Sequence, residues 1–126
     1  MIQYEKVTGD FDLTGKNAIV VGGAGGIGEA TARMYAKKGA NVAIVDCKEN
    51  CPEVAEAIAK EFGVKTIGVK CDVTQQESVD AMMAKVVEAF GEVNILAAMP
   101  GFVDLYRATD IEISTIEKHI AINAVG

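Results

Sequence analysis

The sequence has little of what marks several common classes of protein. Its 126 residues include no Trp, 1 His, 2 Pro and 3 Cys, and the formal net charge is -6. Nucleic-acid binding requires clustered positive charge, and the 12 Lys and Arg residues are scattered, which argues against a nucleic-acid partner. No apolar run approaches the ~20 residues of a membrane span, and no signal peptide is recognisable at the N-terminus. These absences predict a soluble, cytoplasmic protein with no membrane partner.

The few cysteines predict reduced thiols. Cys47, Cys51 and Cys71 are an odd number in a chain without a secretory signal, which is typical of a reducing compartment. The alternative is a zinc site at Cys47, Cys51 and His119. Structural zinc usually takes four ligands at recognisable spacing, and no second pair is present. We therefore expect no metal.

Apolar runs alternate with helix-forming segments along the whole chain. We expect strands over residues 16–21, 41–45, 64–69 and 93–98, and helices over 29–38, 51–62, 74–90 and from 114 onward. Three pairs predict helix capping boxes: Asn50 with Glu53, Thr74 with Glu77, and Ser114 with Glu117. The alternation predicts one α/β domain over residues 1–126, a Rossmann-like doubly wound parallel sheet in three layers, preceded by an extension over residues 1–10. We expect strand order 3-2-1-4, with a ligand crevice at the carboxyl ends of strands one and four.

A glycine-rich turn, VGGAGGIG, joins the first expected strand to the first helix. Glycines allow a tight turn and a close approach of the backbone to a pyrophosphate, and the helix N-terminus offers free N–H groups. The glycines fit three registers, G-x-G-x-x-G from Gly23 and both G-x-x-G-x-x-G and G-x-x-x-G-x-G from Gly22, and spacing does not choose among them. In this context the turn predicts a dinucleotide site, and a turn that binds nothing is the alternative.

An acid at the end of the second strand predicts which dinucleotide is bound. Asp46 lies 18 residues after Gly28, near the position of the acid that bonds the adenosine ribose hydroxyls. A carboxylate there repels a 2′-phosphate, and neither Gly25 nor Cys47 supplies a cation to hold one. The sequence therefore favours NAD over NADP. The alternative is that Asp46 only caps a loop.

The sequence FDLTGKNAIVVGGAGGIGEATA, residues 11–32, resembles the opening of the short-chain dehydrogenase/reductase (SDR) family. The resemblance chooses one register and implies that Gly22, Gly26 and Gly28, with Ile27 between them, bind the cofactor. The family's threonine is replaced by Val21. We therefore expect the turn to be held by its backbone or by a different partner.

Two later segments extend the resemblance. In CDVT it implies that Asp72 lies beside the adenine ring and that the backbone amide of Val73 borders it. A helix-capping role for Asp72 is compatible with this. In GEVNILAAMPG the family's Asn-Asn-Ala-Gly ending is matched only by Gly101. The lost asparagine side chains remove hydrogen bonds that tie the central strands, so other groups compensate or cofactor affinity is reduced.

The last helix and the missing motifs bear on catalysis. Asn123 falls at the place of the family's catalytic asparagine, whose backbone holds a water in a proton relay; the alternative is an asparagine at a packing interface. The family's Tyr-x-x-x-Lys pair is absent, because the residues four after Tyr4, Tyr35 and Tyr106 are Thr, Gly and Asp.

The match covers residues 11–126, which correspond to the first half of a family member. It implies an NAD(H)-dependent oxidoreductase that transfers hydride between nicotinamide and a small alcohol or carbonyl substrate, in a homo-oligomer. We expect the chain alone to be inactive, incomplete at its C-terminus, and prone to associate through an exposed apolar sheet edge. The alternatives are a non-catalytic NAD-binding module and an extended-type sugar-nucleotide epimerase or dehydratase.

Overall fold

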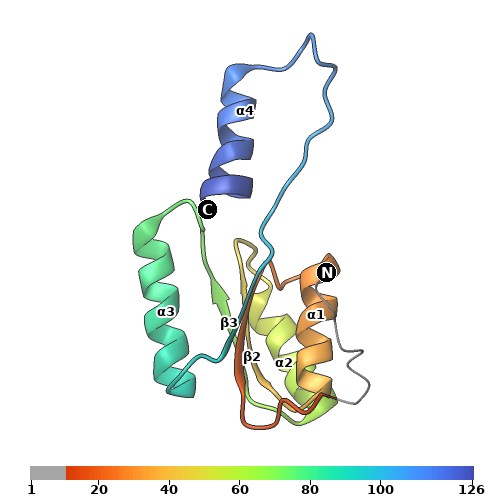
Figure 1. Cartoon of the computed structure of the whole chain (residues 1–126), viewed down its shortest axis with the longest axis vertical. Coiled ribbons are helices and arrows are strands. Elements are labelled where there is room, and N and C mark those ends of the chain that lie inside the picture. The colour runs from red at the N-terminus through yellow and green to blue at the C-terminus, as the bar shows by residue number, and fades with distance from the viewer. Residues whose placement is uncertain (1–10) are drawn as a thin grey trace, which may run out of the picture.

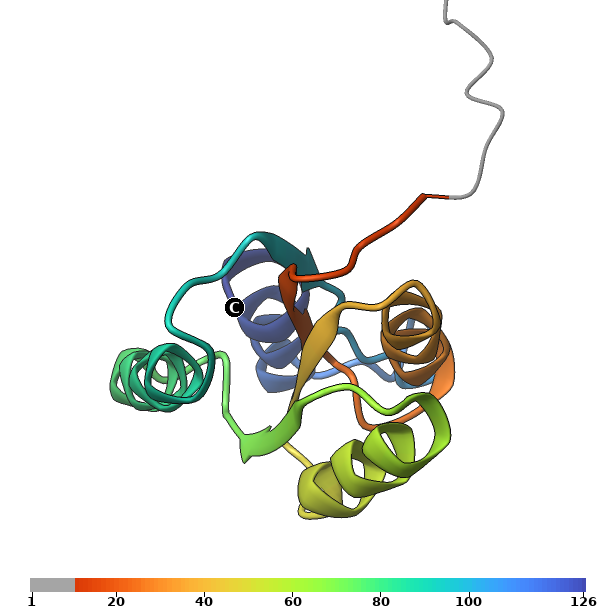
Figure 2. The same cartoon turned by 90° about the horizontal axis from the view of Figure 1, so that it is seen from below.

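The computed structural model describes residues 11–126, which form a parallel sheet covered by helices on both faces (Figures 1 and 2). The elements in chain order are β1 (Asn17–Val21), α1 (Gly26–Lys37), β2 (Asn41–Asp46), α2 (Cys51–Phe62), β3 (Thr66–Lys70), α3 (Gln76–Phe90), β4 (Ile95–Ala98), α4 (Ile113–Ile120) and a π-helical turn η1 (Ala121–Val125). All three strand pairs are parallel and the order is β3-β2-β1-β4. The predicted Rossmann-like topology is confirmed.

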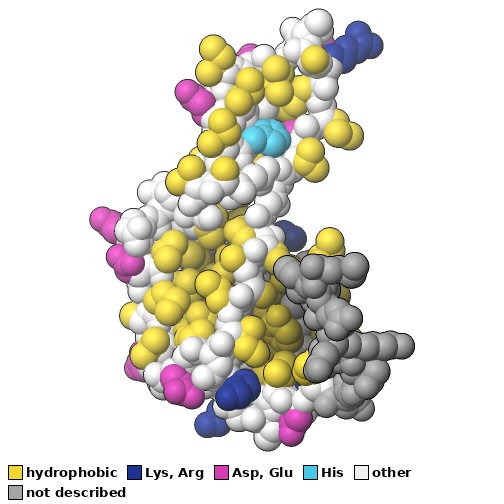
Figure 3. Space-filling view, viewed as in Figure 1, with side chains coloured by type: hydrophobic (Ala, Val, Ile, Leu, Met, Phe, Trp, Pro, Cys, Tyr) yellow, Lys and Arg dark blue, Asp and Glu magenta, His cyan; other side chains and the backbone are white. Residues whose placement is uncertain are grey.

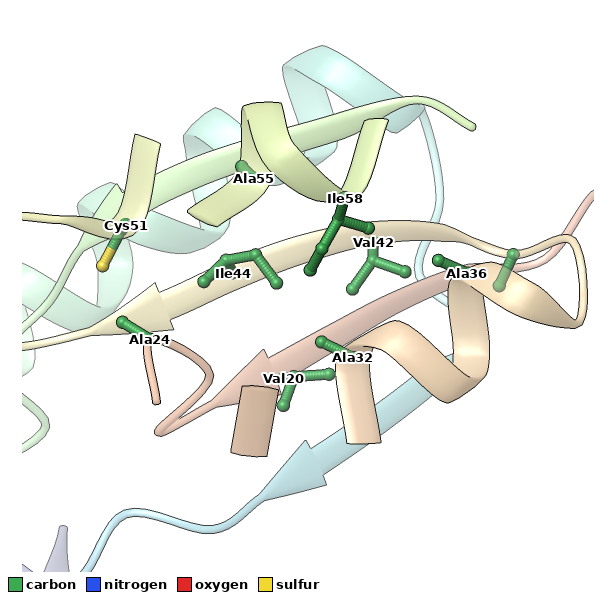
Figure 4. Close-up of a cluster of buried hydrophobic side chains, with 10 residues drawn as sticks. Val20, Ala24, Ala32, Ala36, Val42, Ile44, Cys51, Ala55 and Ile58 are labelled. Carbon is green, nitrogen blue, oxygen red and sulfur yellow. The ribbon is translucent and has the colours of Figure 1, made fainter. Parts of the chain in front are cut away.

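The core explains why the central strands are apolar without alternation. α1 and α2 cover one face of the sheet and α3 covers the other (Figure 2), so β1 and the middle of β2 are buried on both sides. On the first face, small helix residues such as Ala32 and Ala55 let α1 and α2 approach Val20 and Ile44 (Figure 4). On the second face, Ile19 and neighbouring strand residues pack against α3. α4 and η1 stand beyond the carboxyl ends of the strands, joined to β4 by a long loop (Figure 1).

The three predicted capping boxes are wrong. Asn50 does precede α2, but its side-chain amide donates to the Ala24 carbonyl oxygen (3.5 Å) and caps nothing. The Thr74 hydroxyl donates to Asp72 Oδ1 (2.7 Å), and α3 begins two residues later. α4 begins one residue before Ser114, again without a side-chain cap. A capping spacing in the sequence cannot tell whether a loop contact takes the same side chain.

The outer edge of β4 is an exposed apolar surface. β4 pairs with β1 on one side, and within residues 11–126 no strand pairs with its other side. Leu96 is 64% exposed, and Met83 and Val87 on α3 are also exposed. Apolar side chains gather on this face between α3 and α1 (Figure 3), so the exposed edge expected from the sequence is present.

None of the helices in the described chain has the length and apolarity needed to cross a bilayer.

Candidate functional site

A cavity of about 660 Å³ opens at the carboxyl ends of β1, β2 and β4, where the crevice was expected. Its volume is within the ~300–1,000 Å³ range of small-molecule and cofactor pockets. The structure brings every predicted cofactor-binding residue to its wall: Gly22, Gly25, Gly26, Ile27, Gly28, Asp46, Cys47, Asp72, Val73 and Gly101. These residues come from four separate segments of the chain, so the cavity is a product of the sheet topology.

Packing explains the glycines at the two ends of the turn, Gly22 and Gly28. Gly22 has a φ of 82°, and a Cβ there would lie 2.9 Å from the Met99 carbonyl oxygen. A Cβ on Gly28 would lie 1.9 Å from the Gly22 carbonyl oxygen, which is far inside contact distance. Gly22 and Gly28 therefore let the turn approach β4 and let α1 approach the turn.

The middle of the turn is open toward the cavity. A Cβ on Gly26 would meet no other atom within 4 Å, and the residue has a φ of 55°. α1 begins at this glycine, three residues earlier than predicted, and its first backbone bond runs from the Glu29 N–H to the Gly25 oxygen (3.2 Å). The N–H groups of the first turn thus have no intrahelical partner, and no side chain caps them. This wall fits a phosphate or pyrophosphate, because free N–H groups and the helix dipole both favour an anion.

The turn is held without the family's threonine. The N–H groups of Gly22 and Gly23 both donate to the Val45 carbonyl oxygen, at 2.7 and 3.0 Å. The Ala24 N–H donates to Asp46 Oδ2 at 3.1 Å. The expectation of backbone support or a different partner is confirmed, since both are present.

Asp46 ends β2 with its carboxylate between the turn and the following loop. Besides the Ala24 N–H, it accepts the Lys48 N–H on Oδ1 (3.3 Å). The loop-capping alternative therefore describes part of what this side chain does. Oδ1 also accepts the Cys47 thiol (3.5 Å), so of the about four acceptor sites of a carboxylate these three bonds leave about one for a ribose hydroxyl. Next to it, burial raises the pKa of the Cys47 thiol, and the Asp46 carboxylate, which accepts a bond from that thiol, raises it further.

Asp72 follows β3 and folds back on its own loop. Oδ1 accepts the hydroxyl of Thr74 (2.7 Å) and its N–H (2.9 Å), and these bonds lower the pKa of Asp72. The side chain is exposed and stays ionised, while Val73 is half-buried beside it. Both residues line the cavity, and their location beside an adenine ring stays a prediction.

The unusual ending of β4 keeps its backbone pairing with β1. Ala98 is paired with Val21 in the parallel register, and the Met99 N–H continues that pairing by donating to the Val21 oxygen (3.0 Å). The Met99 side chain packs against the core, where its sulfur lies 3.9 Å from the Thr31 hydroxyl oxygen. Pro100 and Gly101 then border the cavity. The ending of β4 is therefore held by its backbone pairing with β1 and by the apolar contact of Met99.

Asn123 lies in η1 and ties the long loop to the helix. Its amide nitrogen donates to the Phe102 oxygen and its amide oxygen accepts the Phe102 N–H, both at 2.9 Å. These two bonds agree with the alternative prediction, in which the Asn123 side chain serves the packing of two segments against each other. The relay function implied by the resemblance belongs to the backbone of Asn123 and stays a prediction. Its neighbour Ile122 and the held Phe102 both line the cavity.

The side chains that surround the hydrogen bonds between Asn123 and Phe102 were not predicted from the sequence. The Phe102 ring stacks on His119 with ring centroids 4.3 Å apart, and Lys118 Nζ lies 4.3 Å from the centre of the same ring. His119 Nδ1 donates to the Thr115 oxygen (2.7 Å), and Nε2 accepts the Asp104 N–H (3.3 Å). No motif signals this cluster, because its members meet only when the loop folds onto α4.

A cation at the cavity wall was also missed. Lys48 lines the cavity, and its Nζ is 3.2 Å from the place that a Cβ on Gly25 would take. Neither Gly25 nor Cys47 carries a positive charge, and the signal that could have found Lys48 is its place two residues after Asp46. All three cysteines are free, with Cys47 exposed and the other two buried. No group of three potential ligands in residues 11–126 could hold a metal ion.

Known proteins match both the sequence and this fold. A family model described as short chain dehydrogenase matches residues 16–126. The chain is 38% identical, over 100% of its length, to D-threitol dehydrogenase of Mycolicibacterium smegmatis, of which it covers 49%. It is 32% identical to NAD-dependent glycerol dehydrogenase of Listeria innocua, over 93% of this chain and 45% of that one.

A solved structure agrees with these relatives. The crystal structure of L-sorbose reductase from Gluconobacter frateurii, complexed with NADPH and L-sorbose, matches with a TM-score of 0.84 and 28% identity, over 92% of this chain and 44% of that one. The chain therefore spans about half the length of the relatives it matches. Together with the glycine turn and the parallel sheet, the family match over residues 16–126 establishes that the chain belongs to the short-chain dehydrogenase family.

Proposed function

We propose that the chain is the dinucleotide-binding part of an NAD(H)-dependent oxidoreductase that interconverts an alcohol and a carbonyl compound. The protein would act in the cytoplasm as a homo-oligomer. Nicotinamide supplies the hydride chemistry when bound. The chain's own contribution is to hold and orient the cofactor: the first turn of α1 for the pyrophosphate, Asp46 for the adenosine ribose, and Asp72 with Val73 beside the adenine.

The observation that carries the proposal is the meeting of these groups at one cavity. The open N–H groups at Gly26 and the carboxylate of Asp46 both face it, although they belong to different βα units. Family membership supports the reaction type, and the name of the Listeria innocua relative supports NAD. Asn123 is proposed to serve catalysis through its backbone. The serine and the tyrosine-lysine pair of the family have no counterpart in this sequence, so we expect no turnover from the chain alone.

Titration of NADH and NADPH into the chain, followed by nicotinamide fluorescence or calorimetry, tests the cofactor assignment. We expect saturable NADH binding and weaker NADPH binding. The Asp46→Ala variant should lose NADH affinity and shift preference toward NADPH, because it loses a ribose acceptor and a negative charge. Absence of NADH binding would contradict the proposal. Thermal unfolding of the variant must be compared as a control, since Asp46 also supports the glycine turn.

A non-catalytic NAD-binding module is the second candidate. The replacement of the family's Asn-Asn-Ala by Ala98, Met99 and Pro100 favours it, because those side chains bring no hydrogen-bonding group to the cavity. An activity assay on a protein of the relatives' full length that contains this chain distinguishes the two candidate functions. Oxidation of polyols with NAD would support the dehydrogenase, whereas tight NAD binding without turnover would support the module.

A further inference from the structure

Lys48 is placed to touch a cofactor from the adenosine end of the cavity. Among the described residues of the cavity wall it is the one with a positive charge. Its backbone N–H donates to Asp46 Oδ1 (3.3 Å), so the residue is held next to the acid that ends β2. Its side chain reaches back toward the glycine turn, where Nζ lies 3.2 Å from the position of a Cβ on Gly25. The backbone of Lys48 is therefore held beside the acid, while its ammonium lies beside the turn.

The ammonium of Lys48 is not neutralised by a neighbouring acid. The adjacent Glu49 is ion-paired with Lys70 from the end of β3. No ion pair joins Lys48 to a carboxylate elsewhere in the described chain. The side chain is exposed, so it needs no burial to present its charge to the cavity. An anion that enters beside Asp46 would find this cation free to bind it.

The proposed function puts the adenosine ribose at Asp46, and the next inference rests on that proposal. A phosphate on the ribose 2′-hydroxyl would project beside the same carboxylate and toward the Lys48 ammonium. The space that a cationic side chain at position 25 would fill already holds this ammonium, supplied from position 48. A lysine acts there as a point charge with three donors, which suits a phosphate.

We propose that Lys48 is a second cofactor-selecting residue, which binds the 2′-phosphate of NADP(H) and opposes the repulsion from Asp46. The cavity then accepts both dinucleotides. NAD(H) still binds more tightly, because the Asp46 carboxylate favours free ribose hydroxyls. The difference in affinity between NAD(H) and NADP(H) is smaller than it would be with Asp46 and no lysine at position 48.

The test is titration of NADH and NADPH into the unaltered chain and the Lys48→Met variant, which keeps an unbranched apolar side chain and removes the charge. Lys65→Met is the matched control, because Lys65 is exposed and does not line the cavity. We expect Lys48→Met to weaken NADPH binding by about tenfold or more, the value of a charge-assisted hydrogen bond, and to change NADH binding by less than about twofold. Lys65→Met should change neither, and Lys48→Arg should keep NADPH binding.

The outcomes separate this inference from the function on which it rests. Equal weakening of NADH and NADPH by Lys48→Met would overturn it, because the lysine would then act on the shared pyrophosphate. Unchanged NADPH binding would overturn it as well, and in both cases NADH binding by the unaltered chain keeps the proposed function intact. If the unaltered chain bound neither cofactor, both proposals would fall together. Matching circular dichroism melts exclude misfolding of the variants as the cause.

Discussion

Gly28, at which α1 packs against the glycine turn, offers the sharpest test of the structure. In Gly28→Ala the new Cβ would lie 1.9 Å from the Gly22 oxygen and 2.6 Å from its carbonyl carbon. Both contacts are with backbone, so no side chain can rotate away and α1 must move. Alanine brings back up to about 1 kcal/mol of helix propensity. Overpacking costs about 1–3 kcal/mol, and a backbone clash belongs at or above the upper end.

We therefore expect the free energy of unfolding to fall by about 2 kcal/mol, which lowers Tm by roughly 8 °C for a chain of this length. Urea unfolding followed by far-UV circular dichroism measures the loss. The matched control is Gly25→Ala. Gly25 has an extended φ of 163°, and its added Cβ would meet only the flexible end of Lys48, at 3.2 Å. The control should unfold within about 0.5 kcal/mol of the unaltered chain, as surface substitutions do.

NADH binding should fall in Gly28→Ala as well. In Gly28→Ala the displacement of α1 moves the first-turn N–H groups away from the pyrophosphate position, so NADH affinity should fall with stability. A Gly28→Ala chain with unchanged Tm and unchanged NADH affinity would refute the reasoning, because the close approach of α1 to the turn would then not exist.

Three further expectations are independent of that glycine. Cys47 should react slowly with iodoacetamide at neutral pH and faster as the pH rises above the usual thiol pKa, because burial and Asp46 raise the pKa of its thiol. Saturating NADH should protect Cys47 from alkylation, since the residue lines the cavity, and mass spectrometry of the alkylated chain measures both effects. Asn123→Ala should release the loop at Phe102 and increase its cleavage by limited proteolysis, while thermal unfolding changes by about 1 kcal/mol or less, since the lost bonds are exposed. Leu96→Lys should reduce concentration-dependent association in sedimentation experiments, because it places a charge on the open edge of β4; unchanged association would mean that another surface mediates it.

The order and type of the elements could be predicted because they follow from local patterns. β1 and β2 are continuous apolar runs, which is what burial on both faces requires, and the glycines after α2 and α3 end those helices with positive φ at Gly63 and Gly91. α2 was placed correctly at both ends. The parallel order β3-β2-β1-β4 followed from alternation and right-handed crossovers.

The clustering of the candidate site residues at one cavity was predictable for a different reason. The cofactor residues were taken mostly from a resemblance to a family, and the cavity wall includes all of them. The predicted capping boxes failed because a polar side chain near a helix has several partners to choose from. Asn50 and Thr74 satisfy loop atoms from Ala24 and Asp72, and no spacing along the chain reveals that choice.

The sequence by itself determined the alternation of strands and helices, the glycine turn and the acid after the second strand, since each depends on neighbours along the chain. Only the tertiary structure decided which residues of different βα units contact one another. It brought Lys48 to the glycine turn, packed Met99 against the core, and joined Asn123 to Phe102. These contacts depend on the close packing of segments far apart in sequence, where distances of a few tenths of an ångström decide which group fits.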